Sequence, residues 1–175
     1  MSKQLILVSA VVFLAALAQP ATASAQISDD KLANAAIDVI HGYGSLTIFD
    51  DVTVTVADRA ITLSGFVTMP FKREEVGARV AKIDGARSLA NNIQVLPVST
   101  TDGNLRARLA QAIYTHPAFW HYAAMACPPI HIIVANGQVV LTGIVNNETE
   151  RALAFALAQV GGVRTVKNEL RLDTR

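Results

Sequence analysis

The sequence has one cysteine, Cys127, among 175 residues, and it is poor in charge, with 17% charged and 6% aromatic residues. One cysteine cannot form an internal disulfide, so apolar cores must hold the folded chain together. We expect the thiol of Cys127 to be buried and inert. Residues 27–99 carry two more acidic than basic side chains, and residues 101–175 carry two more basic than acidic ones. This mild asymmetry argues against nonspecific nucleic-acid binding and permits weak attraction of the second half to anionic surfaces.

The sequence also lacks the patterns that mark catalytic and metal centres. No HExxH, CxxC or GxSxG pattern and no phosphate-binding glycine loop occurs. Cys127 and His131 resemble a nucleophile and a base, but no third group orients them. His131 alternates with two isoleucines, which predicts that it faces solvent from a strand. The acidic pairs at 29–30 and 50–51 are expected to cap a helix and to lie in solvated loops, with a cation site as the weaker alternative. We therefore expect no enzymatic activity, no cofactor, no metal site and no small-molecule substrate.

The N-terminus has the three parts of a secretory signal peptide. Lys3 supplies the positive charge, residues 5–18 form an uncharged apolar run, and Ala-Ser-Ala at 23–25 is a small-residue cleavage site. The apolar run is shorter than the roughly 20 residues that a transmembrane helix needs. We predict a cleavable signal peptide over residues 1–25 and a soluble periplasmic protein, with a retained N-terminal anchor as the alternative.

The rest of the chain contains two copies of one pattern. Ile-Thr-Leu-Ser-Gly-Phe-Val at 61–67 matches Val-Val-Leu-Thr-Gly-Ile-Val at 139–145, and residues 83–95 match residues 160–172. The two offsets differ by one residue, as a single deletion in a connecting loop would produce. Chance does not produce two such blocks in register, so we predict two tandem modules. Their bounds are 27–99 and 101–173.

Hydrophobic periodicity gives both modules the same order of elements, α-β-β-α-β. Two-residue turns, Asp58-Arg59 in the first module and Asn136-Gly137 in the second, join the first two strands into a hairpin. Asn147, with Glu150 three residues later, predicts a helix cap. We therefore expect an α+β fold of two tandem αββαβ modules, each a three-stranded mixed sheet with two helices packed on one face.

Four glycines recur at matching places in the two modules. Gly65 and Gly143 stand near the end of a strand, where a side chain would obstruct a close approach or where a bulge is needed. Gly85 and Gly162 follow the second helix of each module, where a left-handed residue ends a helix. We expect all four to be structural. Thr-Thr-Asp-Gly at 100–103 is expected to be a short linker between the modules.

The two glycine-containing blocks carry a family resemblance. Residues 162–168 read Gly-Val-Arg-Thr-Val-Lys-Asn, and residues 85–91 read Gly-Ala-Arg-Ser-Leu-Ala-Asn, with Ala and Leu at the two Val positions. Together with the strand glycines, these blocks resemble the BON domain (bacterial OsmY and nodulation) family over nearly all of residues 27–173. The resemblance implies the two-domain arrangement of periplasmic osmotic-stress proteins. It also implies a non-catalytic protein that binds phospholipid surfaces or other envelope components. The matching residues build the fold, so they say little about a binding site.

The two modules differ most between the first helix and the hairpin. The second module is five residues longer there, and within seven residues it contains Phe119, Trp120, Tyr122 and Met125. Trp and Tyr favour membrane–water interfaces because they join an apolar body to a polar group. Two arginines of the preceding helix add positive charge. We predict a lipid- or partner-binding surface of six residues: Phe119, Trp120, Tyr122, Met125, Arg106 and Arg108. The alternative is that the aromatic side chains fold into the core or pack between the modules.

These observations leave three functions. The leading hypothesis is a periplasmic envelope-maintenance or stress protein whose second module contacts anionic phospholipid as a peripheral protein, while the first module orients it. The second is a protein-binding adaptor in an envelope or secretion complex, which would use the same aromatic surface. The third is a hydrolase or redox enzyme that depends on Cys127.

Overall fold

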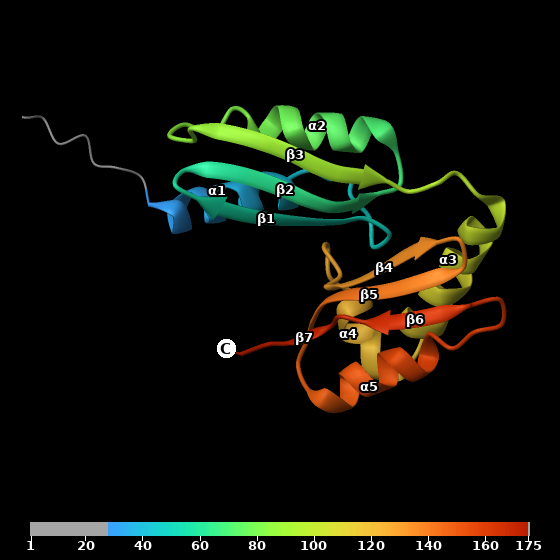
Figure 1. The fold of residues 1–175 in the computed structure, drawn as a ribbon. Coiled ribbons are helices and arrows are strands. Elements are labelled where there is room, and N and C mark those ends of the chain that lie inside the picture. The colour runs from blue at the N-terminus through green and yellow to red at the C-terminus, as the bar shows by residue number, and fades with distance from the viewer. Residues whose placement is uncertain (1–27, 175) are drawn as a thin grey trace, which may run out of the picture.

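A computed structural model describes residues 28–174, and the predicted signal peptide lies outside these residues. Two α/β modules follow each other along the described chain, each with helices packed alongside its sheet (Figure 1). Each module has its own cluster of buried apolar side chains. No helix between residues 28 and 174 is long and apolar enough to cross a membrane.

The first module has five elements in the predicted order: α1 (Asp29–His41), β1 (Asp51–Ala57), β2 (Ala60–Val67), α2 (Pro70–Val80) and β3 (Ser88–Val95). β2 lies in the middle of the sheet, antiparallel to β1 and parallel to β3. Ile61 and Leu63 alternate with half-buried polar residues on β2 and pack in one cluster with Val76 and Val80 of α2. The predicted α+β class and mixed sheet are therefore confirmed.

The second module repeats this order: α3 (Thr100–Tyr114), η1 (Pro117–Phe119), α4 (Trp120–Ala123), β4 (Ile130–Ala135), β5 (Gln138–Val145), α5 (Glu148–Leu157), β6 (Thr165–Asn168) and β7 (Arg171–Leu172). The strand order is β4-β5-β6, and the short β7 also pairs with β5. This sheet therefore has four strands where the sequence predicted three. The last strand of this module is interrupted at residues 169–170, between β6 and β7.

The expected linker at 100–103 forms the first turn of α3. Ser99 caps this helix, since its hydroxyl accepts the N–H of Asp102 at 3.1 Å. The connection between β3 and α3 therefore consists of residues 96–99, in which Val98 is 99% exposed.

Each hairpin turn is held by a carboxylate from the first helix of its module. Asp29 accepts both N–H groups of the turn at 58–59, at 2.9 and 2.8 Å. Asp102 accepts both N–H groups of the turn at 136–137, at 2.8 and 2.9 Å. All four turn residues have positive φ, as the predicted tight hairpin turns require. The expectation that Asp29 caps α1 is wrong, because the side chain of Ser28 takes that place.

The asparagine of the recurring block ties the last strand to the second helix in both modules. The Asn91 amide donates to the carbonyl of Arg73 at 2.9 Å, and the Asn168 amide donates to the carbonyl of Arg151 at 2.9 Å. The repeated motif therefore has a structural role, as expected of residues that build the fold.

The two strand glycines occupy positions where a side chain does not fit. Gly65 and Gly143 have φ values of 115° and 110°. A Cβ atom would lie 2.2 Å from the carbonyl oxygen of Asp51 at the first position and 1.8 Å from that of Pro129 at the second. The predicted close approach of backbones is confirmed.

Gly85 and Gly162 have positive φ as well, 90° and 91°. However, α2 ends at Val80 and its C-cap residue is Ala81, in a right-handed conformation. Gly85 lies four residues beyond that cap, in the turn before β3. Gly162 lies equally far beyond α5, which ends at Leu157 with Ala158 as its right-handed C-cap. The prediction of a left-handed residue is confirmed at both glycines, whereas the idea that they end the helices is wrong at both.

Candidate functional site

Residues 115–129 connect α3 to β4 and contain the two helical turns η1 and α4. His116 caps the start of η1, because its Nδ1 atom accepts the N–H of Ala118 at 3.3 Å. The indole N–H of Trp120 donates to the carbonyl of Thr115 at 3.0 Å. These bonds fold the segment back on the end of α3 and fix the direction of its side chains.

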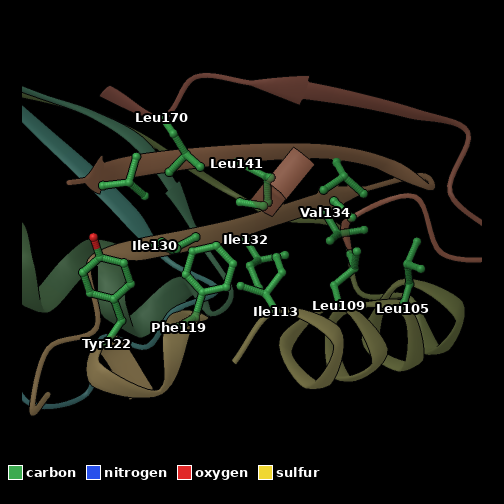
Figure 2. Packing of buried hydrophobic residues seen from close by; sticks show 14 residues of the cluster. Leu105, Leu109, Ile113, Phe119, Tyr122, Ile130, Ile132, Val134, Leu141 and Leu170 are labelled. Atoms are coloured by element: carbon green, nitrogen blue, oxygen red, sulfur yellow. The ribbon is translucent and has the colours of Figure 1, made fainter. Parts of the chain in front are cut away.

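Two of the predicted contact residues face inward. Phe119 is 0% exposed and Tyr122 is 3% exposed, and their rings stack with centroids 6.1 Å apart. Figure 2 shows both rings beside Ile130, within the buried cluster of the second module. Their spacing of three residues places them on one side of a helical segment. Neither side chain is available to a membrane or a partner, so the alternative of core packing holds for these two residues.

The hydroxyl of Tyr122 joins the segment to the start of α5. It donates to Glu150 at 2.7 Å and accepts the N–H of Asn146 at 2.9 Å. Burial and the hydrogen bond to Glu150 raise the pKa of Tyr122 to about 12. Burial alone would raise the pKa of Glu150, but the hydrogen bonds from Tyr122 and Asn146 outweigh it and hold that pKa below its usual value. The N–H of Glu150 donates to the Asn147 side chain at 2.9 Å, which confirms the predicted cap.

The other two apolar residues of the predicted surface point outward. Trp120 is 61% exposed and Met125 is 46% exposed, and residues 123–127 all lie at the surface. Cys127 is among them, so the expectation of a buried thiol is wrong. The segment lies within residues 109–147, which contain no Lys, Arg, Asp or Glu. Contiguous exposed apolar patches mark contact surfaces, and this segment exposes two large apolar side chains within six residues.

The two predicted arginines do not join this surface. Arg106 is half-buried and donates to the carbonyl of Val134 at 2.6 Å. Arg108 is exposed, and its guanidinium lies beside Gly162, near the hairpin-turn end of β5. The Trp120 segment contacts Asn146, at the opposite end of that strand. We correct the prediction accordingly: the arginines and the aromatic residues are at different ends of the sheet.

His131 lies on the outer face of β4 but is not fully solvated. It is half-buried beside Thr142 of β5, and on the same face Ile133 is only 4% exposed. The expectation that this face is open to solvent is therefore wrong. Within residues 28–174 no three His, Cys, Asp or Glu side chains gather in a way that could hold a metal ion.

A buried polar cluster around Asp50 was not predicted from the sequence. Asp50 is 1% exposed and forms an ion pair with Lys72 at 2.6 Å. It also accepts the backbone N–H and the hydroxyl of both Thr47 and Thr68, at 2.7 to 2.8 Å. Burial alone would raise the pKa of Asp50, but the hydrogen bonds from Lys72, Thr68 and Thr47 outweigh it and hold the pKa below its usual value. Asp50 was expected to lie in a solvated loop, and its carboxylate is instead buried within this polar cluster.

Comparison with known proteins places these features in a family. The family model of the BON domain matches residues 28–97 and again residues 101–174. Among curated proteins, none matches the chain significantly.

Two solved structures from Chlamydia trachomatis are similar to the chain. One is described as CdsD, a structural protein of the type III secretion system, with 15% identity, 79% of this chain and 93% of that chain covered, and a TM-score of 0.30. The other is the C-terminal domain of CdsD, with 16% identity, 84% and 100% covered, and a TM-score of 0.30. At this TM-score we base no conclusion on the likeness. The two matches of the family model, by contrast, span most of the sequence, and so the chain belongs to the BON domain family, with two tandem copies of the domain.

Proposed function

We propose that this chain is a non-catalytic envelope-maintenance or stress protein, exported to the periplasm, that contacts phospholipid surfaces through residues 120–127. The observation that supports the proposal most is the exposure of Trp120 and Met125 within a stretch free of charged residues. Family membership supports it too, because BON domains bind membranes or proteins.

The local geometry is suited to peripheral insertion. The N–H of Trp120 is already bound by the Thr115 carbonyl, so the indole can enter an apolar layer without leaving a donor unsatisfied. The buried Phe119 and Tyr122 on either side hold the segment to the core. Because Arg106 and Arg108 lie elsewhere, binding should depend on apolar burial more than on charge and should weaken little with added salt.

Co-sedimentation of the mature chain with phosphatidylethanolamine–phosphatidylglycerol vesicles tests this function. We expect Trp120→Ala to lower the partition coefficient about tenfold, since full burial of a large apolar side chain contributes roughly 1.5–3 kcal/mol. Phe155→Ala is the matched control, because Phe155 is a 40% exposed aromatic residue on α5 of the same module. Equal binding by the two variants, or no binding by the wild type, would refute the proposal.

The second candidate is a protein-binding adaptor in an envelope or secretion complex. The fixed orientation of Trp120 favours it, because a preorganised exposed aromatic residue is the usual anchor of a protein interface. A photoreactive amino acid at position 120 in intact cells distinguishes the two. A discrete protein adduct would support the adaptor, and lipid adducts alone would support the membrane function.

A further inference from the structure

The outer edge of β4 is closed by three hydrogen bonds from three different places. The Ile130 carbonyl accepts the Tyr114 hydroxyl, and the Val134 carbonyl accepts Arg106. Between them, the N–H of Ile132 donates at 2.7 Å to a carbonyl of the first module, that of Ile48. Open strand edges pair with other chains, and natural proteins cover them. The second module therefore closes two edge groups itself and takes the third bond from the first module.

The side chains on either side of Ile48 contact the apolar cores of both modules. Leu46 packs against the buried cluster of the first module, Ile48 and Phe49 pack against that of the second, and Val52 packs against the first again. Residues 47–50 therefore leave the first module's core and place apolar side chains against the core of the second module. We call residues 47–50 the junction segment.

The Asp50 cluster fixes where the junction segment sits. Asp50 accepts five hydrogen bonds, and they link the segment to Thr68 after β2 and to Lys72 of α2. On the other side of the junction, partial burial lowers the pKa of Arg106, while the negative charges of Asp102 and Asp50 act against this.

This device belongs to the first module alone. In the register set by the paired glycines, Pro128 stands at the place of Asp50 and Glu150 at that of Lys72. The second module therefore cannot form the same ion pair. The contact is therefore asymmetric, with the polar cluster in module one and the edge strand in module two.

We propose that the junction segment is a strap through which the first module closes the edge strand β4 of the second, and that the buried Asp50–Lys72 pair holds the strap closed. When the strap opens, the N–H of Ile132 and the apolar surface beneath Ile48 and Phe49 become accessible. The proposal stands on these contacts and does not depend on the proposed function.

Amide hydrogen exchange of the full mature chain tests the strap. In Asp50→Asn we expect the Ile132 amide to exchange at least tenfold faster than in the wild type. The Thr68 amide, which donates to Asp50, should also exchange faster, while the Leu109 amide in the buried part of α3 should not change. Asp51→Asn, at the neighbouring carboxylate, is the matched control and should leave all three rates unchanged.

Two results would overturn the strap. One is a faster Thr68 amide with an unchanged Ile132 amide, which would show that the cluster does not control the edge. The other is an equal acceleration of Leu109 and Ile132, which would show loss of the whole module. If Asp50→Asn does not fold, Ile48→Ala replaces it, because it removes the apolar contact and leaves the Asp50 cluster in place. It should accelerate exchange at Ile132 and leave Thr68 unchanged, and a protected Ile132 amide in this variant would refute the proposal.

Discussion

At the scale of single residues, Gly143 is the position where the backbone leaves least room. Its φ of 110° is unfavourable for a residue with a Cβ atom, and that atom would lie 1.8 Å from the Pro129 carbonyl oxygen. We expect Gly143→Ala to lower the free energy of unfolding by about 2–4 kcal/mol, because strain and a backbone clash add. Denaturant titration followed by Trp120 fluorescence and circular dichroism measures this loss.

Gly103 provides the opposite control for the same measurement. It lies in α3, and no atom lies within 4 Å of the position that its Cβ would take. Gly103→Ala should therefore stabilise the chain by roughly 0.5–1 kcal/mol, because alanine loses less backbone entropy in a helix. Similar losses in both variants would contradict the assignment of strain to Gly143.

The sequence predicts some of these residue roles and not others, for a physical reason. Gly65 and Gly143 recur at one place in a repeat, so comparison of the two modules is enough to identify them. Asp50 and Lys72 have no counterpart pair in the second module, and local sequence does not show that two charged side chains meet in a buried place. Their burial depends on contacts between residues 22 positions apart.

At the scale of elements, the Asp50–Lys72 pair predicts that the free energy of unfolding depends on pH in the acid range. Asp50 has a pKa below its usual value of 3.8 when folded, so it binds fewer protons than in the unfolded chain. Its contribution is complete above the unfolded value and is lost as the pH falls through the lower folded value. We expect the unfolding free energy to fall between about pH 5 and about pH 2, and to fall less steeply in Asp50→Asn.

Asp30→Asn is the control for this acid profile, because Asp30 is exposed on α1. It should reproduce the wild-type slope. A wild-type slope in Asp50→Asn would show that the ion pair contributes nothing to the acid response. Lys72→Met tests the same ion pair from its other partner. Removal of Lys72 leaves the Asp50 carboxylate buried without its counter-ion, which should lower the free energy of unfolding by roughly 3–5 kcal/mol.

The candidate site was predictable as a segment but not residue by residue. The composition of residues 116–129 indicates that the repeat is broken there, and the structure confirms this location. Which aromatic residue faces inward follows from η1 and α4, whose helical geometry puts Phe119 and Tyr122 on one side and Trp120 on another. The sequence pattern alone does not reveal these two short helical turns. The Arg106 bond to Val134 was equally hidden, because it joins elements 28 residues apart.

At the scale of the whole molecule, the tandem arrangement follows from the sequence, and the contact between the modules does not. A repeat predicts each module from its own periodicity, since most contacts of a small domain are internal. The junction segment occurs in one copy and completes the other, so neither pattern alone contains it. The two modules are therefore more dependent on each other than two copies of one pattern would imply.

The whole molecule also determines how its three tyrosines ionise. Burial raises the pKa of Tyr43 and of Tyr114, and burial with the Glu150 hydrogen bond raises that of Tyr122 to about 12. We expect little tyrosinate absorbance from the folded chain at about pH 10, where the urea-unfolded chain is half ionised. Tyr122→Phe should remove the ionisation near pH 12.

The sign of this alkaline effect follows from the raised pKa values. Each folded tyrosine holds its proton more tightly than the unfolded one, so its stabilising contribution is complete below about pH 10 and is lost as the pH rises through the folded value. Circular dichroism on the same samples separates ionisation in the folded state from unfolding. Tyrosinate that forms at about pH 10 while the dichroism is still native would contradict the burial of these side chains. Absorbance and dichroism that change together above this pH would show that the chain ionises its tyrosines by unfolding.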